Sequence, residues 1–440
     1  MYHRMNSPIF EQQIGLELFW TAEPGIGGKL RTHPEDFKVT ERFLYPPRVE
    51  QGRFLIAEVS CKNWETNTLV HDLADRLRIS QRRISFAGTK DKRSYSTQLM
   101  SFENISEEKL VALSLPDVNV QNPYYSSVPV RIGDLQGNRF ELIIRHVDSS
   151  VTENQLNNIL TPVETVHGFP NFYGIQRFGA VRSITHLVGK YIVQGDFERA
   201  AMTYIGHPIP GESEETYRLR EALERTRDYA DAFHTYPASL NFEKAILNKL
   251  IQNPNDFTSA LQELPKNLLM MFVHAYQSYL FNRMLSERLR QNLPIHQATL
   301  GDVIAPVRHG IIQEEYLPVS ASNIDKVNRQ LMKQKAVVTG LLVGSEPTYA
   351  NGRMGEIEQA VLEQEKINPK DFIIPEVPYL SSSGSRRGLL ALLPSLAWTM
   401  QPDDASPGKK AVTLRFELQK GCYATSLLRE LMKAQDPKNY

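Results

Sequence analysis

The chain has 440 residues, of which 41% are hydrophobic, so it can bury a substantial core and its length fits two or three domains better than one. Its 50 basic and 50 acidic residues give a formal net charge of zero. Overall electrostatics therefore favour neither a nucleic-acid partner nor a membrane surface, and only local clusters of charge are informative.

The first twenty residues carry polar and charged side chains throughout and lack the continuous apolar region of a secretory signal, so export is not expected. The longest apolar stretch, Leu268 to Leu285, is interrupted by several polar residues and predicts a buried helix rather than a membrane span. The two cysteines, Cys61 and Cys422, cannot form a disulfide framework and have no further ligand at metal-binding spacing. These features favour a reducing cytoplasm and argue against a structural zinc.

Short segments of alternating hydrophobicity between Phe37 and Arg145 predict strands, arranged as an antiparallel sheet. The segments are Phe37–Glu41, Phe54–Val59, Ile84–Ala87, Gln98–Phe102 and Phe140–Arg145. One amphipathic helix is expected from Leu69 to Leu77, with Thr68 as its cap. This part of the chain therefore reads as α+β.

From about Gly168 to about Gly340, longer helical patterns dominate, such as Glu215 to Phe233 and Lys266 to Asn292. Near the end of the chain, 411–418 alternates as a strand and 426–433 reads as a short helix. A strand that returns after a helical region indicates an inserted domain.

A basic segment precedes and includes the loop Gly88-Thr89-Lys90-Asp91-Lys92. After Asp75, Asp91 is the single acid in 76–93, among the cations Arg76, Arg78, Arg82, Arg83, Lys90, Lys92 and Arg93. Nearby cations favour the ionised form of a carboxylate, and surplus positive charge attracts phosphates. Gly88 permits a tight turn that would present Asp91 on an exposed loop. Solvated hairpins use the same residue types, so the loop alone does not establish catalysis.

Five segments in order along the chain form a specific pattern. They are Pro34-Glu35-Asp36-Phe37-x-Val39, Phe86-Ala87-Gly88-Thr89-Lys90-Asp91-Lys92, Gly137-Asn138-Arg139-Phe140, Asn171-Phe172-Tyr173-Gly174-Ile175-Gln176-Arg177-Phe178-Gly179, and Gly421-Cys422-Tyr423-Ala424-Thr425 with Leu428-Arg429-Glu430. Together they resemble the TruD family of pseudouridine synthases, which modifies uridine at position 13 of tRNA. The resemblance extends over most of the chain, from Gly25 to Lys433.

The resemblance implies an α+β fold. A pseudouridine-synthase catalytic domain with a mixed, mainly antiparallel sheet would comprise residues 1–167 plus 386–440. A mainly helical α+β insertion domain peculiar to the family, the TRUD domain, would comprise residues 168–385. This arrangement agrees with the inserted domain that the periodicity indicates.

The resemblance also implies that Asp91 is the catalytic residue of a reaction that needs no cofactor and no metal. Pseudouridine formation breaks the bond between uracil N1 and the ribose and rejoins the base through C5. A carboxylate can attack an electron-poor carbon and leave again. Whether Asp91 attacks the sugar, attacks the base or removes a ribose proton stays open at this point.

Three residues are expected to support Asp91. Arg31 occupies the position where the family places a basic residue near the catalytic carboxylate, usually lysine, and could orient Asp91 as an ion pair; the alternative is an ordinary surface cation. Alternation places Asn138 and Phe140 on one face of a strand and Arg139 on the other. Phe140 could stack on the target uracil, which is worth about 1–3 kcal/mol, or could be core. Asn138 could bond the carboxylate or the base.

Further residues are candidates for contact with RNA. They are Lys90, Lys92, Arg93, Arg82 and Arg83 in the basic segment, Asn171, Gln176, Arg177 and Phe178 in the fourth motif, and Tyr423, Thr425 and Arg429 near the C-terminus. Tightly packed structural turns use the same residue types as the fourth motif, so that segment could equally be structural. The three C-terminal residues are expected to close the active-site cleft.

The expected partner is tRNA, and the chain is expected to be a cytoplasmic monomer with no membrane association and no obligate protein partner. A catalytically silent RNA-binding protein is one alternative, against which the intact Asp91 argues. An RNA methyltransferase or nuclease is another, but either would need a cofactor loop or a cluster of metal-binding carboxylates, and the sequence presents neither.

Overall fold

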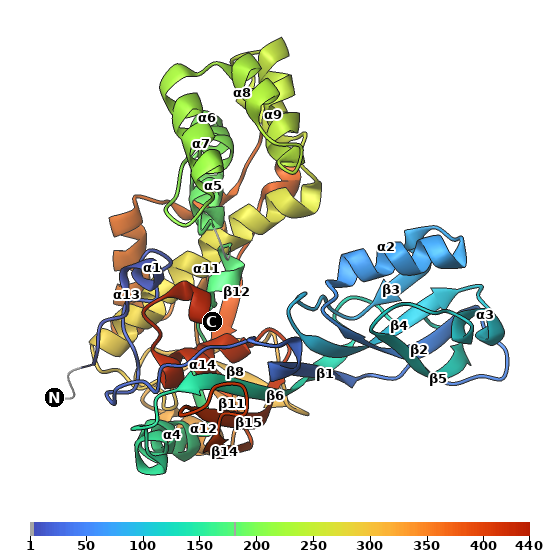
Figure 1. Cartoon of the computed structure of the whole chain (residues 1–440). Helices are drawn as coiled ribbons and strands as arrows, with labels where there is room; N and C mark the ends of the chain where they lie inside the picture. The colour runs from blue at the N-terminus through green and yellow to red at the C-terminus, as the bar shows by residue number, and fades with distance from the viewer. Residues whose placement is uncertain (1–3, 180–181) are drawn as a thin grey trace. The chain divides into compact units, whose positions relative to one another are not determined.

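The computed structural model describes residues 4–179 and 182–440, and the chain forms two compact units (Figure 1). Unit 1 comprises Met1–Trp20, Pro170–Val307 and Ile312–Leu390, and unit 2 comprises Thr21–Phe169, Arg308–Ile311 and Ala391–Tyr440. The domain boundaries expected after residues 167 and 385 stay predictions. Unlike the expected catalytic domain, unit 2 does not include the first twenty residues.

Unit 2 is built on an eight-stranded mixed sheet with the order β14-β15-β6-β1-β4-β2-β5, to which β3 is added beside β4. The strands are β1 (Phe37–Phe43), β2 (Phe54–Lys62), β3 (Ile84–Phe86), β4 (Tyr95–Glu103), β5 (Val118–Ser126), β6 (Leu135–Val147), β14 (Leu396–Pro402) and β15 (Lys410–Gln419). The pair β1 and β4 is parallel, while the other neighbours are antiparallel. The prediction of an α+β fold with a mixed, mainly antiparallel sheet is confirmed.

The helices of unit 2 are α2 (Thr66–Leu77), α3 (Glu107–Val111), α4 (Glu153–Val166) and α14 (Ala424–Met432), with 3-10 turns η1 (Pro34–Asp36), η2 (Gln81–Arg83) and η6 (Pro437–Asn439). Helix α2 lies along one face of the sheet (Figure 1) because Leu69, Leu73 and Leu77 recur at helical spacing and pack on β2 and β4. The expected cap was wrong. The side chain of Glu65 accepts the backbone N–H of Thr68, so the helix begins earlier, at Thr66.

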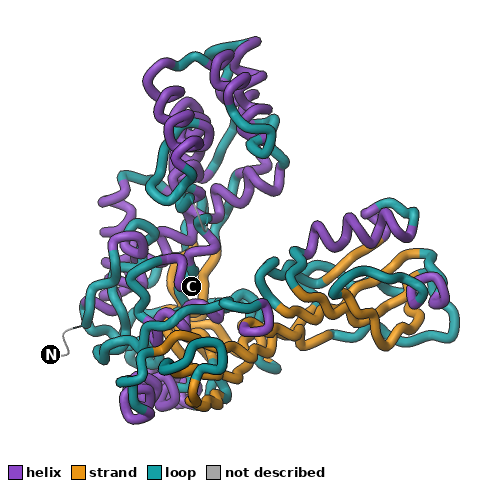
Figure 2. The backbone as a smooth tube through the Cα atoms, in the orientation of Figure 1, coloured by secondary structure: helices purple, strands orange, loops and turns teal. Residues whose placement is uncertain are grey.

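Unit 1 is mainly helical, as the contrast of colours in Figure 2 shows. Its helices are α1 (Ile9–Gln12), α5 (Thr185–Val193), α6 (Phe197–Ile205), α7 (Glu214–Thr226), α8 (Tyr229–Thr235), α9 (Asn241–Gln252), α10 (Phe257–Leu261), α11 (Lys266–Arg290), α12 (Ile324–Met332) and α13 (Gly352–Glu365), with η3 (Ile175–Arg177), η4 (Pro369–Phe372) and η5 (Pro378–Leu380). The single helix expected from 215 to 233 is two helices, because Arg227 adopts a left-handed conformation with φ 54° and ends α7.

A smaller sheet with the order β10-β8-β11-β12 accompanies these helices, with β9 beside β8. Its strands are β8 (Val303–Arg308), β9 (Ile311–Ile312), β10 (Leu317–Pro318), β11 (Ala336–Leu342) and β12 (Ser385–Gly388). The short strands β7 (Gly168–Pro170) and β13 (Leu390–Leu392) pair with each other and span two of the points at which the chain passes between the units.

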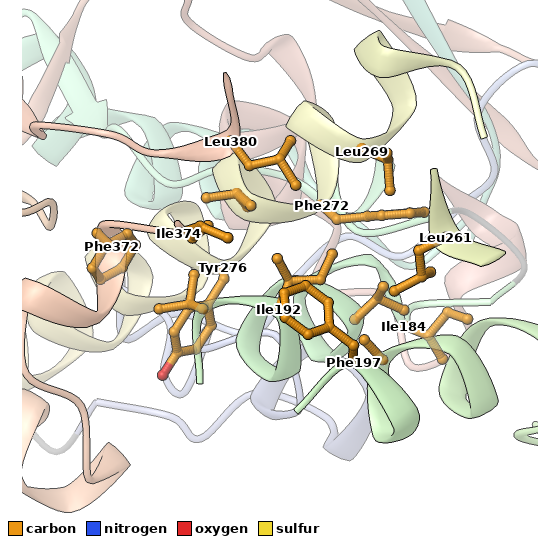
Figure 3. Close-up of a cluster of buried hydrophobic side chains, with 14 of the residues drawn as sticks. Ile184, Ile192, Phe197, Leu261, Leu269, Phe272, Tyr276, Phe372, Ile374 and Leu380 are labelled. Carbon is orange, nitrogen blue, oxygen red and sulfur yellow. The ribbon is translucent and has the colours of Figure 1, made fainter. Parts of the chain in front are cut away.

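Helix α11 is the core element of unit 1. Its residues Phe272 and Tyr276 pack in a cluster with Ile192 and Phe372 (Figure 3). The helix also buries polar side chains that bind other segments. For example, the amide of Asn282 donates to the carbonyl of Tyr173 at 3.0 Å. Helix α11 therefore holds the fourth sequence motif in place through polar bonds as well as apolar contact.

Candidate active site

Asp91 lies in the loop that joins β3 to β4, two antiparallel strands of unit 2. The loop leaves the sheet at Ala87, whose carbonyl accepts the backbone N–H of Gly133 at 2.8 Å. On the other side of Asp91, the hydroxyl of Ser94 donates to the Asp91 carbonyl at 2.7 Å. The loop is thus a hairpin connection with fixed ends, as the sequence predicts.

Lys90, directly before Asp91, is buried and anchors this loop to β1 and α2. Its ammonium lies 2.5 Å from the carboxylate of Glu41 on β1, and the two side chains are 7% and 0% exposed. Its backbone N–H donates to the hydroxyl of Thr66, at the start of α2, at 2.7 Å. The second oxygen of Glu41 accepts the backbone N–H of Leu99 at 3.1 Å. The expectation that Lys90 contacts RNA phosphate is corrected, because its charge is already satisfied inside the protein.

Asp91 itself points outward, with 51% of its side chain exposed, and it is paired with Arg31. Nη2 of Arg31 donates to Oδ2 of Asp91 at 3.0 Å. Arg31 adopts a left-handed conformation with φ 56°, and its carbonyl accepts a bond from the guanidinium of Arg93 at 3.0 Å. Burial lowers the pKa of Arg31, and its pairing with Asp91 opposes that shift. The cation is therefore fixed beside the carboxylate while the carboxylate stays open to solvent.

Three aromatic rings pack in series next to the Arg31–Asp91 pair. The guanidinium carbon of Arg31 lies 4.2 Å from the centroid of the Phe37 ring. Phe37 meets Phe140 edge to face at 6.2 Å, and Phe140 stacks on Phe416 at 5.3 Å. Phe140 is only 7% exposed. The sheet register explains this grouping, because Phe140 on β6 stands opposite Val39 on β1 and therefore shares a face with Phe37.

Asn138 adds a polar group to the same face. It stands opposite Glu41 in the sheet register, and alternation directs Arg139 to the other face, where it pairs with Glu417. Within the described residues, the buried Oδ1 of Asn138 and both amide atoms of Gln98 have no hydrogen-bond partner. A buried unsatisfied polar group costs about 1–3 kcal/mol, so such groups call for a function. Asn138 and Gln98 therefore supply unused bonding capacity beside the Lys90–Glu41 pair.

The remaining cations of the basic segment divide into two kinds. Arg82, Lys92 and Arg93 are exposed, as an RNA contact requires. Arg83 is different, because its Nε donates to the carbonyl of Glu103 at 3.0 Å and its guanidinium also bonds the carbonyl of Asn104. Arg83 therefore ties η2 to the end of β4 and is half-buried, and its contact with RNA stays a prediction.

The three C-terminal candidates belong to α14 and its N-terminal flanking residue, also in unit 2. Tyr423 is the N-terminal flanking residue of this helix and is half-buried. The hydroxyl of Thr425 is buried and has no partner among the described residues. Arg429 is 3% exposed and pairs with Glu430 at 3.2 Å, so its expected contact with RNA is corrected to an internal ion pair.

The fourth motif lies in unit 1 and is mostly buried. Asn171 and Phe178 are 2% and 0% exposed, so their expected contact with RNA is corrected to a packing role. The ring of Phe178 meets His186 edge to face. Gln176 is exposed and Arg177 is half-buried, so these two remain candidates.

The sequence alone did not single out Phe37, Glu41, Thr66 or Gln98 as parts of the site. Phe37 stands in the first of the matched motifs, so the motif itself carried the signal. Glu41 occupies an inward position in the alternation of β1, where a charged residue indicates a buried partner. Nothing local distinguishes Thr66 or Gln98, because their roles depend on segments distant in the sequence.

Two negative findings concern the described residues. In the ranges 4–179 and 182–440, no cluster of three or more His, Cys, Asp or Glu side chains could hold a metal ion. In the same ranges, no helix has the length and apolar character needed to cross a membrane.

Comparison with known proteins adds to this picture. The family model for tRNA pseudouridine synthase D (TruD) matches residues 13–431. A probable tRNA pseudouridine synthase D of Methanococcoides burtonii is 40% identical over 98% of this chain and 99% of its own, and one of Methanosarcina barkeri is 41% identical over the same shares. The crystal structure of the putative tRNA pseudouridine synthase D from Methanosarcina mazei superposes with a TM-score of 0.87 at 38% identity, covering 99% of this chain and 100% of that one.

The family match, the relatives and the structural match together define the class of this protein as RNA pseudouridine synthase. The chain belongs to the TruD family, whose members isomerise uridine to pseudouridine in tRNA.

Proposed function

We propose that this chain converts a uridine of tRNA, at position 13, to pseudouridine, with Asp91 as the catalytic carboxylate and without a cofactor. The observation that carries the proposal is the combination of a clamped backbone at Lys90 with an open carboxylate at Asp91. An enzyme gains rate when its reactive group is held in place before the substrate arrives. Asp91 meets this requirement, because a hydrogen bond from the Lys90 backbone to Thr66 fixes its loop and Arg31 fixes its carboxylate.

The reaction is an isomerisation, so all atoms of the uridine are retained. The bond between N1 and the ribose breaks, the base turns, and C5 bonds to the ribose carbon while a proton leaves C5 and one is gained at N1. A single carboxylate that attacks and then leaves can serve both halves of this exchange. The three modes of action left open above, attack on the sugar, attack on the base and removal of a ribose proton, all use the same exposed oxygens.

The other residues take supporting roles. Arg31 orients Asp91 through the ion pair between them. Phe37 and Phe140 are 6% and 7% exposed and pack against each other beside the carboxylate, so they support the site from within the sheet. Oδ1 of Asn138 offers an unused acceptor to the N3–H of the uracil. Because a uridine in folded tRNA is stacked, the base must turn out of the stack at a cost of a few kcal/mol before it meets these groups.

Exposed cations around the loop are proposed to bind the RNA backbone. Arg82, Lys92 and Arg93 are exposed. Each phosphate contact adds to the loss of RNA affinity that occurs as the salt concentration rises. Tyr423 and Thr425 are proposed to contact the RNA at the active site. The chain is further proposed to act in the cytoplasm as a monomer.

The test is incubation of the purified chain with an unmodified tRNA transcript, without added metal or cofactor, followed by chemical mapping of pseudouridine. The expected result is pseudouridine at position 13. Pseudouridine at another position would refute the site assignment but not the reaction. Complete absence of pseudouridine, with RNA binding retained, would favour a catalytically silent RNA-binding protein.

A further inference from the structure

In unit 1, two guanidinium groups share one aromatic ring. The Cζ of Arg387 lies 4.1 Å from the centroid of the Tyr173 ring, and the Cζ of Arg177 lies 5.8 Å from the same centroid. The ring attracts each cation, but the two cations repel each other. An anion bound between or beside them would remove that repulsion, so this arrangement is typical of an anion-binding site.

Neutral groups hold the cluster in position. Nη2 of Arg387 donates to Oδ1 of Asn171 at 2.6 Å, and the amide of Asn171 in turn donates to the carbonyl of Gly388 at 2.9 Å. The backbone N–H of Tyr173 donates to Oδ1 of Asn282 at 2.9 Å, and the amide of Asn282 donates back to the Tyr173 carbonyl at 3.0 Å. The ring and the Arg387 guanidinium are therefore fixed before any ligand arrives, which lowers the entropic cost of binding.

Arg177 is a cation that no carboxylate of the described residues neutralises. Its Nε donates to the hydroxyl of Ser278 at 3.2 Å, and among the described residues no carboxylate lies within ion-pair distance of it. Other arginines of unit 1 behave differently. Arg288 pairs with Asp302 at 2.7 Å and Arg386 pairs with Glu358 at 2.7 Å, and all four side chains are buried. The half-buried guanidinium of Arg177 therefore remains available to an anionic ligand.

His274 is an exposed residue of α11. Its carbonyl accepts the hydroxyl of Ser278, so it lies one turn away from the residue that orients Arg177. Partial desolvation, and after it the charge of Arg177, lowers the pKa of His274. The neutral imidazole can still donate a hydrogen bond. Gln176, next to Arg177, is exposed and can donate as well.

We propose that Arg177 and Arg387 form a binding site on unit 1 for a phosphodiester group of the RNA substrate. The inference rests on the proposed function for the source of the phosphate. Guanidinium groups present their donors in a planar fork that matches phosphate oxygens, and Tyr173 fixes that fork by stacking. Such a contact positions the RNA and reads no sequence.

The test is the salt dependence of binding to an unmodified tRNA transcript. The variants are Arg177→Gln and Arg387→Gln, with Arg218→Gln as a matched control, because Arg218 is exposed and pairs with Glu214 on α7 of the same unit. Each site variant should reduce the slope of log Kd against log salt by about 0.7 to 0.9, the amount for one lost phosphate contact. Arg177→Lys should keep most of the slope because it keeps the charge. The control should match the parent chain.

Arg177→Gln is the decisive variant, because it loses a single internal hydrogen bond and is expected to fold, as a circular-dichroism melt can check. An unchanged slope in this folded variant, with a parent chain that makes pseudouridine, would overturn the phosphate site. A reduced slope in a parent chain that makes no pseudouridine would support the site and refute the proposed function instead. Competition by inorganic phosphate alone, without any change in the RNA slope, would identify a site for small anions and also overturn the proposal.

Discussion

Lys90 and Glu41 form an ion pair that is almost completely buried beneath the loop that exposes Asp91. The two residues are 49 positions apart in the chain, on different elements of the sheet unit. Their pairing makes Lys90 a positioning residue for Asp91, the next residue in the loop. Lys90 and Lys92, on either side of Asp91, carry the same charge but are given different roles, and this difference can be tested.

Lys90→Met is expected to lower stability strongly, because it leaves the carboxylate of Glu41 buried without its cation. Breaking a buried pair in this way costs about 3–5 kcal/mol. Lys92→Met should change stability by less than about 0.5 kcal/mol, since Lys92 is exposed. Urea denaturation of both variants measures the difference. Equal, small effects would show that the Lys90–Glu41 pair does not anchor the loop.

A second variant separates anchoring from simple damage. In the double variant Lys90→Met with Glu41→Met, no charge remains buried, so most of the lost stability should return. Activity should stay low, because Asp91 has lost the bond that fixes the residue before it. Full recovery of activity in the double variant would contradict the positioning role of Lys90.

Arg31→Gln is expected to lower kcat by about 100-fold, because the carboxylate of Asp91 loses the group that orients it. The thermal midpoint should change little, since the Asp91 side of the pair is half exposed and such pairs contribute about 0–1 kcal/mol. Arg31→Lys should restore much of the rate. Single-turnover kinetics with tRNA measure the effect, and a raised KM with an unchanged kcat would indicate an RNA-binding role for Arg31 instead.

The burial of His186 should make the free energy of unfolding depend on pH. Desolvation by burial lowers the pKa of His186 to about 4, while a backbone contact and Glu365 oppose this shift. The unfolded chain binds the proton with a pKa of about 6.5. Stability from this group is therefore complete above about pH 6.5 and is lost as pH falls toward 4, by roughly 3 kcal/mol at most.

The matched variant is His186→Phe, which keeps an aromatic ring against Phe178 and Tyr279. Denaturation at a series of pH values should give a shallower loss of stability between pH 6.5 and 4 for the variant than for the parent. Identical pH dependence of the two proteins would show that His186 is not held neutral by burial.

Much of the fold follows from local patterns. Alternation located the strands that contain Phe37 and Phe140, and helical spacing located α11. The ends of elements were less predictable, because they depend on single contacts. Glu65 starts α2 before Thr68, and Arg227 divides one expected helix in two by adopting a left-handed conformation.

The site divides in the same way. The position of Asp91 on an exposed turn follows from Gly88 and the flanking strands, all of them local. Burial of Lys90 and Arg429 could not be predicted from their neighbours in sequence. The partner of Lys90 lies on a distant strand, and Arg429 is enclosed by the packing of α14. Charge in a sequence therefore indicates RNA contact only after the fold has shown which charges are already paired.

The most direct test of the account is the rate of pseudouridine formation by Asp91→Asn in tRNA. Asparagine keeps the size of the side chain and the bond from Arg31 but cannot serve as the nucleophile or base. We expect turnover below detection, with the Kd for tRNA within about threefold of the parent, a change of less than about 0.7 kcal/mol. Pseudouridine formed at the parent rate by the Asp91→Asn variant would contradict it.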